Sequence, residues 1–207
     1  MYFPGILAFE ENIRRTYRVY TKNRVKKALI VAENIDFIRR CPSLEYLSVI
    51  PALSAENFDF SPLYDMPNIK WLQCETMYGE KENKVSNVDY SRIRGLQRLA
   101  VTGAKGHNQV ESVKGLKILY FSSGQPVSKT LKGSFDGSLL EELRMVSSNK
   151  LPNLNFIYNM PKLKSFIFMM NTENGDLSMC ERIPYVAIKN RKHYSHKDKD
   201  FSKETAI

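Results

Sequence analysis

Apolar residues recur along the chain in a short phrase that places them at its first, fourth and sixth positions. The phrase is clearest in LQRLAV, which begins at Leu96, and in LKILYF, which begins at Leu116, and a glycine precedes both. Its first positions are Val25, Leu44, Ile69, Leu96, Leu116, Leu140, Leu163 and Ile183, of which Val25 opens the weakest match. Successive starts are 19 to 27 residues apart. Such a fixed period indicates a repeat architecture.

Each copy of the phrase predicts a short β-strand. Alternation between its fourth and sixth positions places two apolar side chains on one face of the strand. A single strand cannot bury that face, but stacked copies cover one another and form a parallel sheet with a continuous core. The segments between strands contain capping residues with a proline or glycine, and we expect short helical or irregular turns there.

The repeats resemble those of leucine-rich repeat proteins over about residues 25–191. The resemblance implies an α/β solenoid of about eight repeats, with a parallel sheet on one face and short helices, turns and irregular loops on the convex face. The family's characteristic Asn or Cys, three residues after the sixth position, is matched only by Asn171. We therefore expect an irregular solenoid, similar to divergent bacterial members, rather than a smooth horseshoe.

The two ends of the chain differ from the repeats. Residues 1–24 are interpreted as an N-terminal capping segment, in which residues 13–20 could form a strand or hairpin that shields the first repeat. Residues 192–207 are interpreted as a basic, polar C-terminal tail. We expect this tail to cap the far end briefly, and then to become disordered.

The third, fifth and seventh positions of each phrase are expected to face solvent, on the side of the sheet that is usually concave. They contain the only tryptophan, together with tyrosines, arginines and aliphatic residues, which are typical of protein-binding surfaces. The candidate partner-binding residues are Tyr46, Trp71, Gln73, Arg98, Ile118, Tyr120, Glu142 and Arg144. Two alternatives are that a loop or terminal segment covers this face, or that the apolar residues are simply tolerated there.

Composition and charge narrow the partner class. The chain has 43% hydrophobic and 26% charged residues, as is usual for a globular protein, and a net charge of +9. Residues 1–27 carry +5 and residues 189–207 carry +3, which leaves +1 for the middle. A protein whose body binds phosphate backbones would carry a basic stripe along that body. We therefore expect a protein partner, with nucleic-acid clamping by the basic termini as the alternative.

The cellular setting is inferred from what the sequence contains. Its first residues lack the order of a secretory signal, no apolar run is long enough to span a bilayer, and three widely spaced cysteines do not suggest a disulfide framework. We expect a reduced, cytoplasmic protein that does not insert into membranes. A cell-surface adhesion domain trimmed from a longer precursor is the competing interpretation.

Catalytic and metal-binding interpretations have little support. None of His107, His193 and His196 lies on a predicted strand beside a Ser or Cys nucleophile, so a triad lacks a base. His193 and His196 could approach one metal ion if the tail were helical, but a solvated tail is the simpler interpretation. The loops GAKGHN and SSGQPVSKT lack the spacing of a phosphate-binding loop. We expect no cofactor and no small-molecule substrate.

These observations favour a non-enzymatic module that binds a protein partner through the exposed strand face. The resemblance to small bacterial repeat proteins suggests a narrower hypothesis, an immunity-type protein that antagonises one partner protein. Fold alone does not determine function, so this hypothesis rests on analogy.

Overall fold

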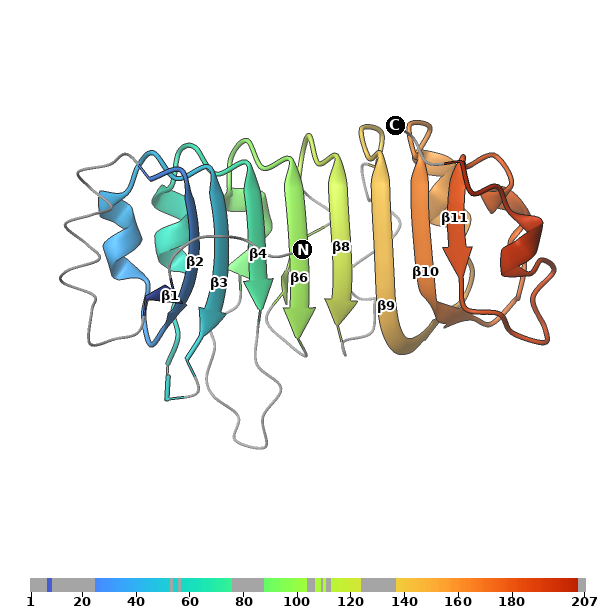
Figure 1. The fold of residues 1–207 in the computed structure, drawn as a ribbon, viewed down its shortest axis with the longest axis horizontal. Helices are drawn as coiled ribbons and strands as arrows, with labels where there is room; N and C mark the ends of the chain where they lie inside the picture. Colours follow the sequence, from blue (N-terminus) through green and yellow to red (C-terminus); the bar gives the residue numbers. More distant parts are fainter. Residues whose placement is uncertain are drawn as a thin grey trace.

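The computed structural model describes residues 7–8, 25–52, 54–55, 57–75, 88–103, 107–108, 110, 113–123 and 137–204. Nine parallel strands form one sheet, side by side along the long axis of the molecule (Figure 1). In sheet order they are β1 (Leu7–Ala8), β2 (Lys27–Ala32), β3 (Tyr46–Pro51), β4 (Trp71–Glu75), β6 (Arg98–Gly103), β8 (Ile118–Ser123), β9 (Glu142–Leu151), β10 (Ser165–Thr172) and β11 (Tyr185–Ile188). Apart from the first, each strand begins at the third position of a phrase.

The register of the sheet confirms the alignment of the repeats. Third positions lie directly opposite one another from Lys27 on β2 to Tyr185 on β11, and fifth positions do so from Leu29 to Ala187. Every first, fourth and sixth position is buried except Val25 and Ala28, which are partly buried in the first repeat. The inward and outward faces of the strands are therefore those that the sequence predicts.

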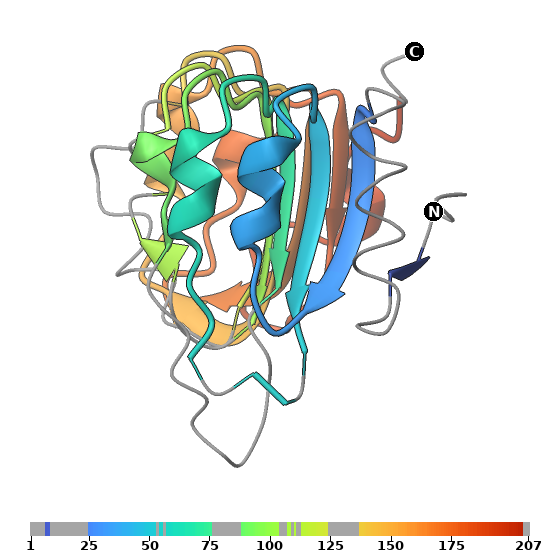
Figure 2. The same ribbon diagram turned by 90° about the vertical axis from the view of Figure 1, so that its left-hand side faces the viewer.

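Connecting segments cover the inward face of the sheet with 3₁₀ turns, and the described residues contain no α-helix (Figure 2). The turns that precede the strands are η2 (Asp36–Arg40), η3 (Ser61–Asp65), η4 (Tyr90–Arg92), η6 (Asn155–Asn159) and η7 (Ser178–Cys180). A further small sheet pairs β5 (Val88–Asp89) with β7 (His107–Asn108). The prediction of short helical and irregular turns behind the sheet is confirmed.

A three-residue period of apolar residues explains why these turns are 3₁₀. In the repeat before β10, Ile157 N–H donates to Leu154 C=O, Met160 N–H to Ile157 C=O, and Leu163 N–H to Met160 C=O. All four side chains are buried. Because a 3₁₀ helix has three residues per turn, residues three apart project on one side, and here that side faces the sheet.

Short polar side chains start most of these turns. Asp59, Asp89, Asn153 and Asp176 each accept a hydrogen bond from the backbone N–H two residues later. Such local side-chain bonds satisfy amides that the turn itself leaves unpaired. They provide a similar polar contact in the repeat that contains Asn171 and in three repeats that lack the family's characteristic Asn.

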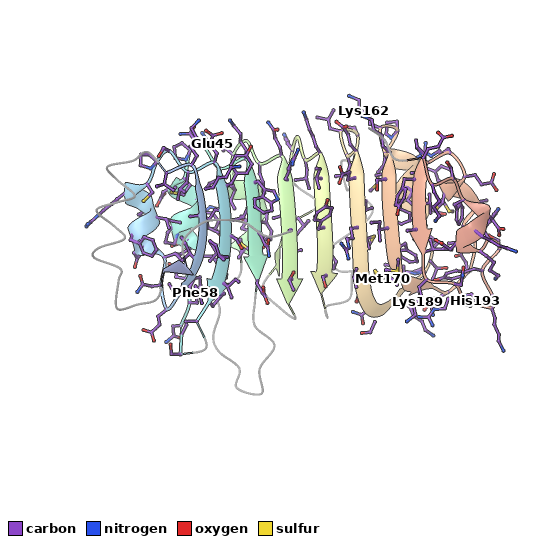
Figure 3. The ribbon with its side chains drawn as sticks, in the orientation of Figure 1. Glu45, Phe58, Lys162, Met170, Lys189 and His193 are labelled. Carbon is purple, nitrogen blue, oxygen red and sulfur yellow. The ribbon has the colours of Figure 1, made fainter. Side chains whose placement is uncertain are left out.

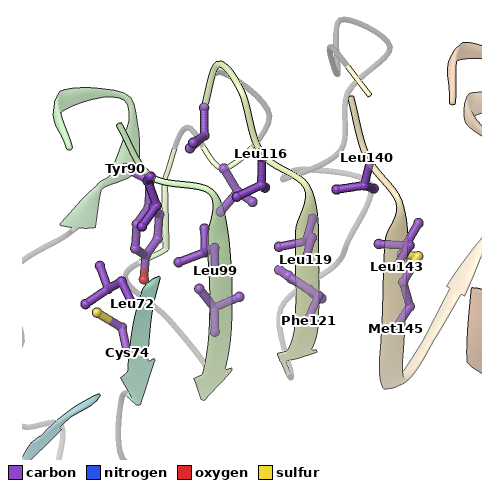
Figure 4. Close-up of a cluster of buried hydrophobic side chains, with 14 of the residues drawn as sticks. Leu72, Cys74, Tyr90, Leu99, Leu116, Leu119, Phe121, Leu140, Leu143 and Met145 are labelled. Carbon is purple, nitrogen blue, oxygen red and sulfur yellow. The ribbon is translucent and has the colours of Figure 1, made fainter. Parts of the chain in front are cut away.

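The core is continuous from one end of the array to the other. Figure 4 shows neighbouring columns of buried side chains, such as Leu116, Leu119 and Phe121 beside those of β9. Tyr90 is fully buried in this core, and its hydroxyl forms a hydrogen bond with the Cys74 thiol. One buried polar pair is thus satisfied within an otherwise apolar layer.

The C-terminal segment folds as a cap on β11, which corrects the expectation of a solvated tail that becomes disordered after a brief cap. Tyr194 and Phe201 are buried, at 4% and 6% exposure. The outer amides of β11 are also satisfied, because Val186 N–H donates to Ser202 C=O and Ile188 N–H donates to the Asp198 carboxylate at 2.8 Å. Apolar residues spaced among the charges made this cap possible.

At the other end, β1 pairs with β2 in parallel and extends the sheet by one short strand. The predicted capping strand or hairpin of residues 13–20 lies outside the described residues.

Gly175 provides a test of the cap. Its φ is +67°, and an added Cβ would lie 2.3 Å from the His193 carbonyl oxygen, whereas Gly115 has φ +83° with no atom within 4 Å of such a Cβ. We expect Gly115→Ala to cost about 1 kcal/mol of unfolding free energy from backbone conformation alone. Gly175→Ala should cost clearly more, since the cap must also move. Denaturant unfolding of both variants measures the difference, and equal losses would show that the cap does not pack on Gly175.

Candidate functional site

Two surfaces display exposed side chains from equivalent positions of successive repeats. The first is the strand face, defined as the third, fifth and seventh positions of the phrases. The second is the rim, defined as the turns at residues 25–26, 41–45, 66–70, 93–97, 113–117, 137–141, 160–164 and 181–184. The rim turns lead directly into the strands, so both surfaces are placed by the same backbone. Figure 3 shows Glu45 and Lys162 along this edge of the sheet.

The structure brings all eight predicted partner-binding residues onto the strand face in adjacent strands. In the third-position row, Trp71 lies opposite Arg98, and Arg98 lies opposite Ile118. Ile118 in turn lies opposite Glu142 on the next strand. Gln73, Tyr120 and Arg144 belong to the fifth-position row. The predicted arrangement of side chains is present, while its role in binding stays a prediction.

An aromatic pair lies at the β3–β4 end of this set. The ring centroids of Tyr46 and Trp71 are 6.3 Å apart with the planes tilted by 54°, and Lys27 Nζ lies 4.8 Å from the Tyr46 centroid. Both aromatic residues are partly buried. A tilted aromatic pair with a cation over one ring is a favourable arrangement that holds large side chains in place.

Tyr120 is the centre of a polar group at β8 and β9. Its hydroxyl donates to Glu142 Oε2 at 2.9 Å, and the residue is 38% exposed. Burial and the bond to Glu142 raise the pKa of Tyr120, while Arg144 and Arg98 act in the opposite direction. The phenol therefore remains neutral near pH 7, where it can donate or accept a hydrogen bond with a partner.

The rim carries a row of charges at the second position of six of the eight phrases, with Gln97 and Pro184 as the neutral exceptions. Glu45 accepts ion pairs from Lys26 and Lys70 at 2.8 Å each, and Glu141 pairs with Lys164 at 2.9 Å. The bonds to Lys26 and Lys70 lower the pKa of Glu45 to about 2. Sequence reasoning missed this row, although the residues Lys, Glu and Lys at one position of successive repeats were a visible signal.

The rim also overturns the inference that charge excess is confined to the ends of the chain. Its turns contain eight Lys or Arg and three Glu, a net charge of +5. The middle of the chain is nearly neutral in total, but its positive and negative side chains lie in different places. A sum of charges along the sequence does not show this separation. The rim therefore has a net positive charge that Glu45, Glu141 and Glu181 interrupt.

The cap brings together a serine, a histidine and a glutamate. Ser195 Oγ lies 2.8 Å from His196 Nδ1, and His196 Nε2 lies 2.8 Å from Glu181 Oε1. Ser195 Oγ also accepts the Leu177 N–H at 3.0 Å. These contacts join the cap to the last repeat, and we assign them that structural role.

His193 likewise joins the cap to the sheet, with Nε2 2.8 Å from the Thr172 carbonyl oxygen. In the part of the chain that the structure describes, no three His, Cys, Asp or Glu residues are grouped so as to hold a metal ion. The side chain of His107 and most of the loops that begin at Gly103 and Ser122 lie outside the described residues.

The three cysteines are free and buried. Burial raises the pKa of Cys74 to about 12, against a small opposing effect of Tyr90, and it also raises the pKa of Cys180 to about 12. Thiols with such a pKa stay protonated and are poor nucleophiles. Cys74 occupies the sixth position of its phrase, and it is fully buried there as a small core residue. Of the residues described, none forms a helix that is long and apolar enough to cross a bilayer.

Comparisons with known proteins give the fold. No protein-family model matches the sequence, and no curated protein matches it. Internalin C2 from Listeria monocytogenes superposes with a TM-score of 0.52 at 14% sequence identity, over 75% of this chain and 66% of that one. The chain thus has the leucine-rich repeat fold of bacterial proteins.

Two further structures match less well. A leucine-rich repeat protein of Leptospira interrogans gives a TM-score of 0.48 at 15% identity, over 77% of this chain and 40% of that one. The functional domain of InlJ from Listeria monocytogenes gives 0.47 at 11% identity, over 86% and 47%. The chain spans less than two thirds of the length of each of these three proteins.

The rim ion pairs predict an acid-shifted titration of Glu45. Its carboxylate should titrate with a midpoint near pH 2 in the folded protein. Because the folded pKa lies below the unfolded value, its contribution to stability is present above about pH 4.5 and is lost as pH falls towards 2. Lys70→Gln should raise the midpoint, as measured by carboxyl NMR titration. A midpoint that is unchanged in this variant would show that Lys70 does not hold Glu45.

Proposed function

We propose that the chain is a non-enzymatic binding module that holds a protein partner on its strand face. The observation that supports this most directly is the register, which sets Trp71, Arg98 and Tyr120 on adjacent strands of a rigid sheet. Tryptophan, arginine and tyrosine are the residues that dominate the binding free energy of protein interfaces. A sheet also loses little conformational freedom on binding, which favours affinity.

The strand face suits a protein better than a small ligand. Its candidate residues span the strands from β3 to β9, with apolar, cationic and anionic groups interspersed. Protein interfaces are of this mixed kind, with aromatic anchors within a polar surround. A small-molecule site would instead be a concave pocket that encloses its ligand.

The proposed partner relationship is antagonism, in which a partner protein is sequestered by an immunity-type protein in the cytoplasm. This narrower proposal rests on the analogy with small bacterial repeat proteins. It predicts a one-to-one complex that blocks the activity of the partner. A gene for a toxic protein next to the gene for this chain would support it.

The nucleic-acid alternative is less well supported by the C-terminal segment. Lys197 Nζ donates to the carbonyl oxygens of Arg191 and Tyr194, and Lys203 Nζ pairs with Asp198. These cations therefore stabilise the cap, and fewer remain for phosphate contacts. Residues 1–6 and 9–24 lie outside the described residues.

Substitution of the strand face tests the main proposal. Trp71→Ala with Tyr120→Ala should remove the partner from pull-downs of source lysate. When the partner is purified, its affinity for the double variant should be at least about 30-fold weaker, which corresponds to a loss of about 2 kcal/mol of binding free energy. Tyr158→Ala serves as the control, since Tyr158 is 60% exposed on η6 and away from the strand face. Circular dichroism must show that both variants are folded.

Equal recovery of the same partners by the wild type and the double variant would place the binding surface elsewhere. Loss of the same partners by the Tyr158→Ala control would also contradict the proposal.

A further inference from the structure

Lysine and arginine residues gather on the rim in the middle of the array. The relevant turns lead into β4, β6 and β8, and they carry Lys70, Arg94, Lys114 and Lys117. Between Glu45 on one side and Glu141 on the other, these turns contain no acidic residue. We call this part of the rim the basic window. The described structure therefore contains a local cationic site that linear charge counting did not find.

Backbone hydrogen bonds hold the basic window together. Gln97 N–H donates to Lys70 C=O at 2.8 Å, and Lys117 N–H donates to Gln97 C=O at 2.8 Å. Lys70, Gln97 and Lys117 are therefore immediate neighbours in three successive repeats. Adjacent strands are about 4.8 Å apart, so the three span roughly 10 Å. The backbone positions that carry these side chains therefore have a fixed spacing.

Most cations elsewhere on the rim are already engaged. Lys26 pairs with Glu45, Lys164 pairs with Glu141, and Arg182 donates to the Ile157 carbonyl. In contrast, Arg94 and Lys114 form no ion pair with any described residue. Lys117 forms none within contact distance either, although its charge contributes to the lowered pKa of Glu141. Several charges in the basic window are thus free to pair with a ligand.

The basic window adjoins the strand face without a gap. Lys70 is followed by Trp71, Gln97 by Arg98, and Lys117 by Ile118. These second residues are the third-position row that lies in register across β4, β6 and β8. A protein seated on the strand face at these strands would therefore place its border on the rim cations.

We propose that the basic window binds an acidic segment of the protein partner, a short run of Asp and Glu at the border of the surface that occupies the strand face. This inference rests on the proposed function, because the same partner contacts both surfaces. Charge complementarity across such a border steers encounter and selects the partner.

The length of the basic window favours a protein segment over a nucleic acid. The three repeats span roughly 10 Å, and the cations there that form no ion pair with a described residue are Arg94, Lys114 and Lys117, a number that matches a few carboxylates. A nucleic-acid strand would continue past the window at both ends, where Glu45 and Glu141 are ionised and would repel its phosphates. Proteins that bind such backbones present longer tracks of Lys and Arg.

The test uses the full chain and two probes, a tetraglutamate peptide and a single-stranded DNA of four phosphates. Trp71 is the only tryptophan and lies next to Lys70, so its fluorescence reports on binding at the window. The peptide should bind at low salt and should bind more tightly than the DNA. Lys114→Gln with Lys117→Gln should weaken peptide binding about tenfold, the effect expected for losing close charge pairs.

The control variant is Lys150→Gln with Lys189→Gln. It makes the same change in net charge, and both residues are exposed away from the rim: Lys150 lies near the C-terminal end of β9, and Lys189 directly follows β11. We expect less than about a twofold change in peptide affinity, since general screening alone would act. Equal losses in both variants, no peptide binding, or tighter binding of the DNA would each overturn the inference.

The two proposals can fail separately. If the Trp71→Ala, Tyr120→Ala variant loses the captured partner but the Lys114→Gln, Lys117→Gln variant keeps full affinity for it, the strand-face proposal stands and the acidic-segment inference is wrong. If the strand-face variant keeps the partner, the proposed function itself fails, whatever the probes show.

Discussion

The fold depends on one shared hydrogen-bond acceptor per repeat. At the start of a strand, the carbonyl of the second position accepts from two successive amides of the following repeat, as Glu45 C=O does from Lys70 and Trp71. The same pair of bonds recurs from β3 to β10. A shift of one residue would break both bonds and would turn every apolar side chain to the opposite face. Core, strand face and rim all follow from this register.

The register also assigns core packing and surface display to different positions of each repeat. Inward positions and the three-residue turns supply the buried area, while the outward positions make few demands on the fold. Tyr120, Arg144 and Lys117 therefore occupy places where packing of the core does not decide the side chain. A binding surface on such a scaffold can vary without loss of the array, as is known for repeat proteins in general.

The sequence predicted the strands and their partners because the strand signal is local and is repeated many times. Leu99 and Leu119, for example, face the core in adjacent strands as the phrase requires. The type of turn was not predicted, although apolar residues three apart, such as Leu154 and Ile157, carried the signal. The rim was missed, and the cap was expected to be only brief, for another reason. Glu45 with Lys70, and Tyr194 with Met170, are contacts between residues that are distant in the sequence.

The C-terminal cap has a consequence for how such an array can evolve. Since Ser202 and Asp198 occupy the amides of β11, a new repeat added after it would find no free edge on which to pair. At this end, duplicated repeats can be accommodated only before β11, where both neighbours offer the same shared-carbonyl contact. The last repeat and its cap would then be inherited as a single unit.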